Sequence, residues 1–258
     1  MASLRARLGG DPAWASAIVA LAFGALAASN ALSACISVAD SDAPELLPDP
    51  AAATLVVPSR TALVIACSDG AVAATGNATA SRAALSTAKL YLAEHVLSRA
   101  GLAEEDRALV GRMIARSDDH AADILDGRHP SAIDSVADRY GLQETVRIDR
   151  WGTSRTSAAD LVAFLQRARE TRAGREVLAL MATTELIAAD GERQDWGVAR
   201  IPGMEGVKLG WSDWGEPTVA SVGFGDGFIV AGSTIGSREQ HTADIAGATE
   251  GSCVDALG

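Results

Sequence analysis

The chain has 258 residues, of which 48% are hydrophobic and 21% are charged, a composition typical of a globular protein with a sizeable core. Its formal net charge is −11, and no stretch concentrates lysine and arginine. Because nucleic-acid phosphates bind to positively charged surfaces, this charge excludes nucleic acid as an expected partner.

The N-terminus predicts an export signal. Two early arginines precede an uncharged, alanine-rich stretch at residues 12–39. Residues 32–35, Leu-Ser-Ala-Cys, resemble the lipobox of bacterial lipoproteins, where the signal is removed before a cysteine that then carries lipid. We therefore expect a signal peptide at 1–34 and a protein outside the cytoplasm, anchored to the outer face of the cell membrane by lipid on Cys35. The alternative is an uncleaved transmembrane anchor.

Residues 35–58 have the prolines, aspartates and alanine run of a flexible linker, so the folded domain is expected at 59–258. Disulfides persist outside the cytoplasm, and with Cys35 assigned to lipid the other two cysteines form an even set. Cys67 and Cys253 are predicted to pair. Two buried free thiols are the alternative.

Hydrophobic periodicity predicts strands at both ends of the domain and helices between them. Residues 61–66 and 71–75 are expected to form a hairpin, and period two returns beyond residue 203. Neither end makes a stable sheet alone, so we expect an α+β fold whose antiparallel sheet is built from both ends. The later strands are expected at 207–210, 218–224 and 228–234, before a short final helix; the earlier helices are expected at 86–100, 104–116, from about 118, 131–140, 157–170 and 175–187.

The two lysines, Lys89 and Lys208, stand against twenty arginines. A position that keeps lysine in such a chain favours a role for a compact ammonium that can lose its proton. Ser86 precedes Lys89 by three residues, so their side chains share a helix face and the amine can activate the hydroxyl. The alternative is a surface lysine near an N-cap serine.

Two further motifs follow in a fixed order: Ser-Asp-Asp at 117–119 and Lys-Leu-Gly at 208–210. With the Ser-x-x-Lys helix, they resemble the class A β-lactamases and penicillin-binding proteins over residues 59–258. The resemblance implies a β-lactamase/transpeptidase-like fold. The short interval between Ser86 and Ser117 implies a trimmed helical region.

The resemblance also implies roles for these residues. Ser86 would be the acylated nucleophile, Lys89 its base or proton relay, and Ser117 the residue that passes a proton to the leaving nitrogen. Lys208 would attract the substrate's carboxylate, and backbone N–H groups of Ser86 and of the strand near Ser212 would form the oxyanion hole. The substrate would be a D-alanyl cell-wall peptide or a β-lactam, with no cofactor and no metal. The remaining substrate-binding positions are Asp119 and Gly210.

Three departures from the family pattern limit the expected activity. Asp119 replaces asparagine, and a carboxylate near Lys89 is expected to raise the pKa of its ammonium. Leu209 replaces a hydroxyl residue that binds the carboxylate, a loss of about 1–3 kcal/mol. Residues 140–157 lack the Glu-x-x-Leu-Asn element that activates deacylating water, and Glu144 has no matching context. Efficient β-lactam hydrolysis is therefore not expected.

Two functions remain open: a serine acyl-transfer hydrolase, or a catalytically inactive envelope protein that binds an unidentified partner.

Trp211 and Trp214 could wall a cleft or cover a strand end. The histidines lack the spacing of a zinc-binding helix, so surface or capping roles are expected for them; they are His95, His120, His129 and His241.

Overall fold

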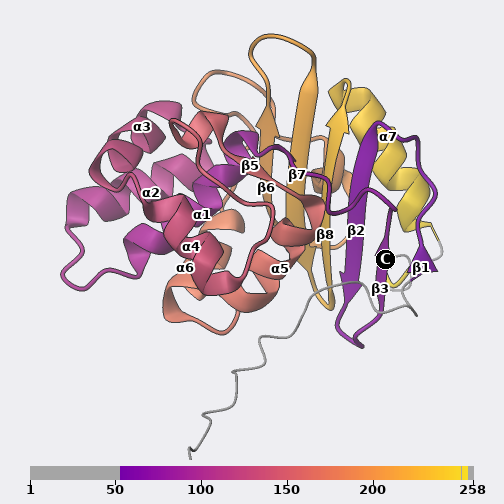
Figure 1. The fold of residues 1–258 in the computed structure, drawn as a ribbon, viewed down its shortest axis with the longest axis horizontal. Helices are drawn as coiled ribbons and strands as arrows, with labels where there is room; N and C mark the ends of the chain where they lie inside the picture. Colours follow the sequence, from indigo (N-terminus) through magenta and orange to yellow (C-terminus); the bar gives the residue numbers. More distant parts are fainter. Residues whose placement is uncertain (1–52, 251, 255–258) are drawn as a thin grey trace, which may run out of the picture. The chain divides into compact units, whose positions relative to one another are not determined.

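Strands from both ends of the chain lie side by side in one six-stranded sheet (Figure 1). The computed structural model describes residues 53–250 and 252–254, so the predicted signal peptide and Cys35 lie outside the described residues. The strand order is β1-β3-β2-β8-β7-β6, and only β1 and β3 pair in parallel. The predicted sheet is therefore confirmed, with one parallel pair at its edge. Its strands are β1 (Ala53–Thr54), β2 (Thr61–Cys67), β3 (Val72–Ala74), β6 (Met204–Trp211), β7 (Thr218–Gly225) and β8 (Phe228–Ile235).

Alternating side chains of β2 give the sheet two apolar faces. Ala62, Val64 and Ala66 belong to the large core shared with the helices. Leu63 and Ile65 point the other way, into a smaller cluster that includes residues of the C-terminal helix. This period-two pattern, with both sides buried, explains why the strand is apolar throughout.

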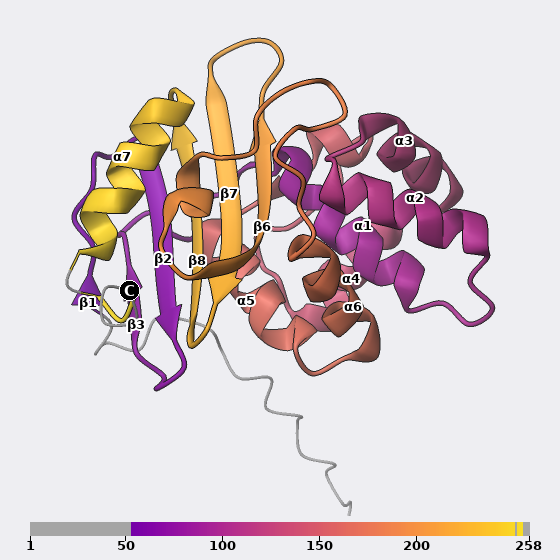
Figure 2. The same ribbon diagram turned by 180° about the vertical axis from the view of Figure 1, so that it is seen from behind.

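The helices divide between the two faces and one edge of the sheet. α5 packs against β2 and β8, α7 lies across the opposite face, and the other helices gather beside the β6 edge (Figures 1 and 2). The site described below lies at this edge. The helices are α1 (Ala88–Leu97), α2 (Glu104–Ala115), α3 (Asp119–Arg128), α4 (Ala132–Tyr140), α5 (Ala158–Ala168), α6 (Arg172–Met181) and α7 (Arg238–Thr249). Short elements complete the fold: β4 (Arg82–Ala83) pairs with β5 (Arg155–Thr156), and 3-10 turns occur at η1 (Leu85–Thr87), η2 (Trp151–Thr153) and η3 (Gly197–Arg200).

Two predicted boundaries are wrong. Ala53–Thr54 of the expected linker form β1, and Leu55 packs against the smaller apolar cluster, so the fold includes residues before 59. The helix expected to reach residue 187 ends at Met181. There the hydroxyls of Thr183 and Thr184 donate hydrogen bonds to the Leu180 and Met181 carbonyls, which satisfies the helix end locally.

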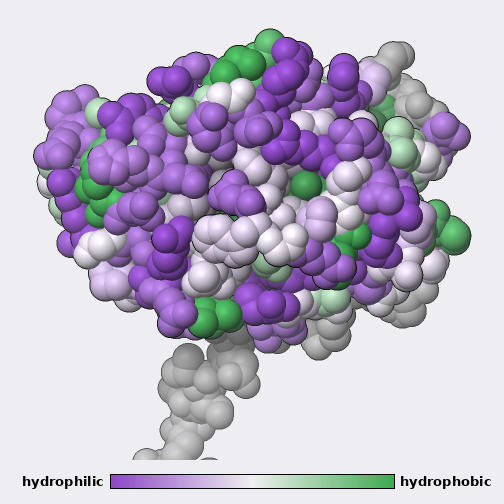
Figure 3. All heavy atoms as spheres, turned by 90° about the horizontal axis from the view of Figure 1, so that it is seen from above, coloured by the Kyte–Doolittle hydropathy of each residue, from purple (hydrophilic) through white to green (hydrophobic). Residues whose placement is uncertain are grey.

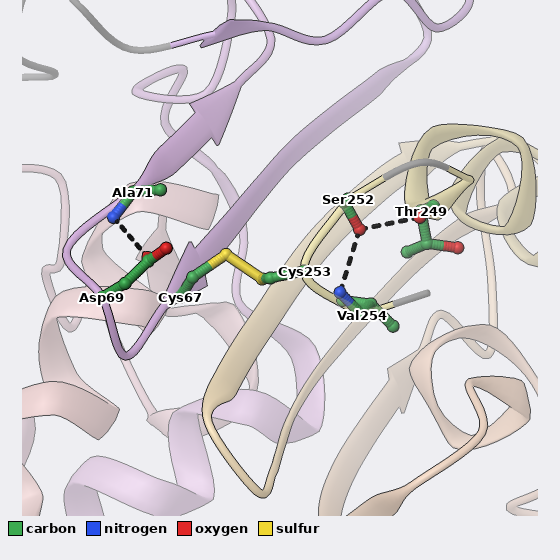
Figure 4. The surroundings of a disulfide bond; sticks show 7 residues. All are labelled: Cys67, Asp69, Ala71, Thr249, Ser252, Cys253 and Val254. Carbon is green, nitrogen blue, oxygen red and sulfur yellow. Dashed lines mark hydrogen bonds between the residues drawn. A yellow bond between two sulfur atoms is a disulfide. The ribbon is translucent and has the colours of Figure 1, made fainter. Parts of the chain in front are cut away.

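The predicted disulfide is confirmed. Cys67, at the end of β2, is bonded to Cys253, which follows α7, and their Cα atoms are 6.2 Å apart (Figure 4). The bond closes a loop across nearly the whole domain. Within residues 53–250 and 252–254, no helix is long and apolar enough to cross a bilayer.

Candidate active site

Ser86 lies in the 3-10 turn η1, at the base of a cavity of about 270 Å³ that we call the cleft. The preceding residue, Leu85, has a φ of 53°, in the left-handed region that residues other than glycine rarely adopt. Backbone strain of this kind is concentrated at functional sites. Ser86 is 8% exposed, and its hydroxyl makes no hydrogen bond to any described residue. The cleft is also lined by Asp119, residues 150–153, Asp190, residues 211–214, Glu216 and Thr218.

Lys89, one helical turn after Ser86, is fully buried, and its ammonium is directed toward the α2–α3 connection. Its Nζ lies 2.7 Å from the Ser117 carbonyl oxygen, 3.2 Å from Ser117 Oγ and 2.5 Å from Asp119 Oδ1. The ring of Trp151 covers it, with 4.6 Å between Nζ and the ring centroid. No hydrogen bond joins Ser86 to Lys89 in the described structure, so the direct contact expected from their spacing is not formed here.

Ser117 connects the two lysines. Its backbone has a φ of 51°, and Asp118 after it caps α3 by accepting a hydrogen bond from the Ala121 N–H. This turn places Ser117 Oγ 2.8 Å from Nζ of Lys208, which is fully buried on β6. Two lysines from distant parts of the sequence therefore contact the same hydroxyl, that of Ser117.

Burial governs the charge of this lysine pair. It lowers the pKa of Lys208 well below its usual value, and the nearby charge of Lys89 lowers it further. Burial also lowers the pKa of Lys89, while Asp119 acts in the opposite direction. Asp119 raises the pKa of Lys89 as expected, but desolvation outweighs the carboxylate, so the net pKa of Lys89 is lowered. Burial thus favours the neutral amine over the ammonium in this pair.

Gly210 lets the edge strand approach the nucleophile. A Cβ built on Gly210 would lie 2.7 Å from the Ser86 backbone nitrogen, closer than any side chain could sit. The motif's glycine is thus required by the contact between β6 and η1. Its neighbour Leu209 is fully buried beside Trp196 and Val219 and offers no hydroxyl to the cleft.

The second oxyanion-hole donor was expected on the strand near Ser212, and the strand pairing makes the Trp211 N–H the candidate there. The Ser212 N–H already donates to the Thr218 carbonyl at 3.0 Å, so these residues form a hydrogen-bonded pair with β7. Antiparallel pairs alternate, and Trp211 opposite Val219 is therefore a non-hydrogen-bonded pair whose N–H points away from β7. Because β6 is the edge strand, this N–H faces the side where Ser86 lies.

The segment at residues 150–153, which also lines the cleft, brings no carboxylate into it. Residues 150–153 contribute Arg-Trp-Gly-Thr to the lining. Glu144 is absent from the lining, and its backbone N–H donates to the carboxylate of Asp160 in the first turn of α5. Among the described residues, no group of three or more histidine, cysteine or acidic side chains could hold a metal ion.

Sequence reasoning missed the neighbouring residues Arg150 and Trp151 at η2, and Asp190 from the α6–η3 connection, which all line the cleft. No local pattern distinguishes them from ordinary surface residues. Trp211 and Trp214, for which two roles were left open, do line the cleft.

No family model and no curated protein match the chain. Solved structures match it at low identity. A carbapenemase from Vibrio cholerae is 14% identical with a TM-score of 0.59, over 74% of this chain and 94% of that one. A penicillin-binding protein from Listeria monocytogenes in its cefotaxime-bound form is 18% identical with a TM-score of 0.55, over 73% and 95%. A variant of the last common ancestor of Gram-negative class A β-lactamases is 16% identical with a TM-score of 0.57, over 73% and 89%.

The Ser-x-x-Lys, Ser-Asp-Asp and Lys-Leu-Gly motifs follow one another along the chain and meet in the structure. Each motif lies where the edge strand, the first long helix and the α2–α3 connection converge. The chain has the fold of the class A β-lactamases and penicillin-binding proteins.

Proposed function

We propose that the protein is a serine acyl-transfer hydrolase whose nucleophile is Ser86. The observation that carries this proposal is the Ser86 hydroxyl, which has no partner among the described residues and lies at the base of a cleft beside two buried lysines. The acyl donors are D-alanyl cell-wall peptides or the β-lactams that mimic them. Two of the similar structures, a carbapenemase and a cefotaxime-bound protein, support this substrate class.

In the proposed reaction, Ser86 Oγ attacks the carbonyl carbon and its proton passes to the lysine pair. The oxyanion is stabilised by the N–H groups of Ser86 and Trp211, which the contact at Gly210 holds side by side. As the carbonyl–nitrogen bond breaks, Ser117 gives its proton to the leaving nitrogen and recovers one from a lysine.

Turnover is expected to be slow. Hydrolysis of the acyl-enzyme needs an activated water, and residues 150–153 bring no carboxylate to activate it. The carboxylates that do line the cleft belong to other segments than the family's Glu-x-x-Leu-Asn element; they are those of Asp119, Asp190, Asp213 and Glu216. The acyl group is therefore expected to persist on Ser86, which is the behaviour of a penicillin-binding protein rather than of an efficient β-lactamase.

The test is acylation by a fluorescent penicillin, read as an added mass on the intact protein. Ser86→Ala should remove the label, whereas Ser98→Ala, an exposed serine at the end of α1, should leave it unchanged. Label that persists for hours supports the proposal. A folded protein that stays unlabelled at high penicillin concentration argues against it.

A second candidate, a binding protein without catalysis, is favoured by one contact. Asp119 holds the Lys89 ammonium at 2.5 Å, and this ammonium makes no hydrogen bond to Ser86 in the structure as described. Restoring the family pattern with Asp119→Asn and Leu209→Thr separates the two functions. Faster labelling of the double variant indicates a weakened catalyst, while an unlabelled variant indicates a site that only binds.

We further propose that the protein is an exported lipoprotein attached to the outer face of the membrane through Cys35. The Cys67–Cys253 disulfide supports an oxidising compartment. Full-length protein made in a bacterial host should partition into a detergent phase, and Cys35→Ala should shift it to the aqueous phase. Equal partitioning of both proteins contradicts lipid attachment at this cysteine.

A further inference from the structure

The cleft carries an excess of negative charge. Four carboxylates line it, those of Asp119, Asp190, Asp213 and Glu216, against the single guanidinium of Arg150. Asp119 is paired with a buried lysine, but the other three form no ion pair among residues 53–250 and 252–254. The side chains that line the cleft therefore sum to a net negative charge.

The two lysines beneath the cleft do not offset this negative charge. Lys89 directs its ammonium to two oxygens of Ser117 and to Asp119, and these three contacts equal the donors an ammonium has. Lys208 donates to Ser117 and to the Leu209 carbonyl. Both side chains are fully buried and neither lines the cleft, so neither offers its charge to a ligand.

Tryptophan side chains form the walls. Trp151, Trp211 and Trp214 line the cleft, and Trp214 is 79% exposed on the β6–β7 connection. Indole faces attract organic cations through the ring quadrupole, and the ring of Trp151 already covers Lys89 in this way. An exposed tryptophan beside free carboxylates is the chemistry of a site for an ammonium group.

We call the unpaired carboxylates of Asp190, Asp213 and Glu216 the acidic rim. The unpartnered hydroxyl of Ser86 in the same cleft marks this rim as part of a ligand site. The serine is more than nine-tenths buried, lines the same cleft and has no hydrogen-bond partner among the described residues. The β6–β7 connection that carries Asp213, Trp214 and Glu216 projects upward in Figure 1, and Figure 3 shows a mainly hydrophilic surface on that side. Asp213, Trp214 and Glu216 thus line the same cleft as the nucleophile.

We propose that the cleft selects acyl donors that carry an ammonium group, such as a peptide with a free side-chain amine, over donors with a carboxylate at that position. The ammonium lies against Trp214 between Asp213 and Glu216, with the scissile carbonyl at Ser86. This inference rests on the proposed acyl transfer for its chemical step. In that step the Ser86 Oγ–carbonyl carbon bond forms, the bond to the leaving group breaks, and the serine proton ends on the leaving group.

The test uses three p-nitrophenyl esters of equal chain length that end in trimethylammonium, tert-butyl or carboxylate. The rate of Ser86 acylation is followed by nitrophenolate release, with Ser86→Ala as background. We expect the cationic ester to react about tenfold faster than its neutral isostere at low salt and the anionic ester to be slowest. The preference should shrink as salt screens the rim.

Variants of exposed rim residues locate the effect without disturbing the core. Asp213→Asn with Glu216→Gln, and separately Trp214→Ala, should remove the preference for the cation. Asp226→Asn, an exposed acid in the turn at the opposite end of β7, is the matched control and should keep it. Equal rates for the cationic and neutral esters, or an unchanged preference in the rim variants, overturn the inference while leaving acyl transfer intact.

A binding measurement separates this inference from the proposed function. Choline and its neutral carbon isostere are titrated while tryptophan fluorescence is recorded, a readout that needs no reaction. If no ester labels Ser86 but choline binds and Trp214→Ala abolishes the binding, acyl transfer fails and charge selection stands. If choline binds no better than its isostere, charge selection fails whatever the esters do.

Discussion

Replacing Gly210 by alanine tests the contact on which the proposed oxyanion hole depends. The new Cβ would lie 2.7 Å from the Ser86 nitrogen and 2.9 Å from Leu85 Cβ. Since ordinary contact begins near 3.4 Å, η1 and β6 must separate by about 0.7 Å at the point where the two N–H donors converge. Misplacement approaching 1 Å costs about 100-fold in rate, so we expect a loss of that order in Ser86 acylation.

The same substitution overpacks a buried contact, which costs about 1–3 kcal/mol of stability. Acylation by fluorescent penicillin gives the rate, and thermal unfolding shows that the variant is folded at the assay temperature. Gly111→Ala on α2 is the control, because a Cβ there meets nothing within 4 Å. If Gly210→Ala is acylated as fast as the unaltered protein, the strand contact does not set the oxyanion hole and the reasoning is refuted.

Three further predictions follow. Asp119 opposes the burial that lowers the pKa of Lys89, so Asp119→Asn should lower that pKa further and move the pH profile of acylation toward lower pH; an unmoved profile contradicts the role assigned to this carboxylate. Burial lowers the pKa of His241 to about 4 from 6.5, so the unfolded chain binds a proton first as pH falls. The protein should lose about 3 kcal/mol of unfolding free energy between pH 6.5 and 4, and urea titrations of His241→Gln should lack this part of the slope. Replacing Cys67 and Cys253 by serine should cost about 5 kcal/mol in the chain-entropy model for a loop with a sequence separation of 186, measured by urea unfolding; unchanged stability contradicts it.

The elements of the fold were predictable because their causes are local. The continuous apolar run of β2 and the helical spacing of α1 to α5 depend on residues close in sequence. The end of α6 was not predictable in the same way. Its apolar spacing continues to residue 187, but hydroxyls of Thr183 and Thr184 take the terminal carbonyls.

In the candidate site, too, the local motifs were predictable from sequence and the tertiary contacts were not. The spacing of Ser86 and Lys89 and the order of the three motifs could be predicted from sequence, since each motif is a short run with a geometric requirement of its own. The direction of the Lys89 ammonium could not, because the α2–α3 connection supplies its acceptors. Asp119 raises the pKa of Lys89 as predicted, yet burial, a property of the assembled core, outweighs it.

The sequence by itself determined the motifs and the strand-helix-strand order, and it predicted the Cys67–Cys253 pair. Only the tertiary structure decided which backbone N–H of the edge strand faces the side of Ser86, because strand register sets the direction of the Trp211 N–H. It also decided the charge of the cleft. Asp190 and Glu216 come from loops far apart in the chain, and the electrostatic field of a site depends on distances that exist only after folding.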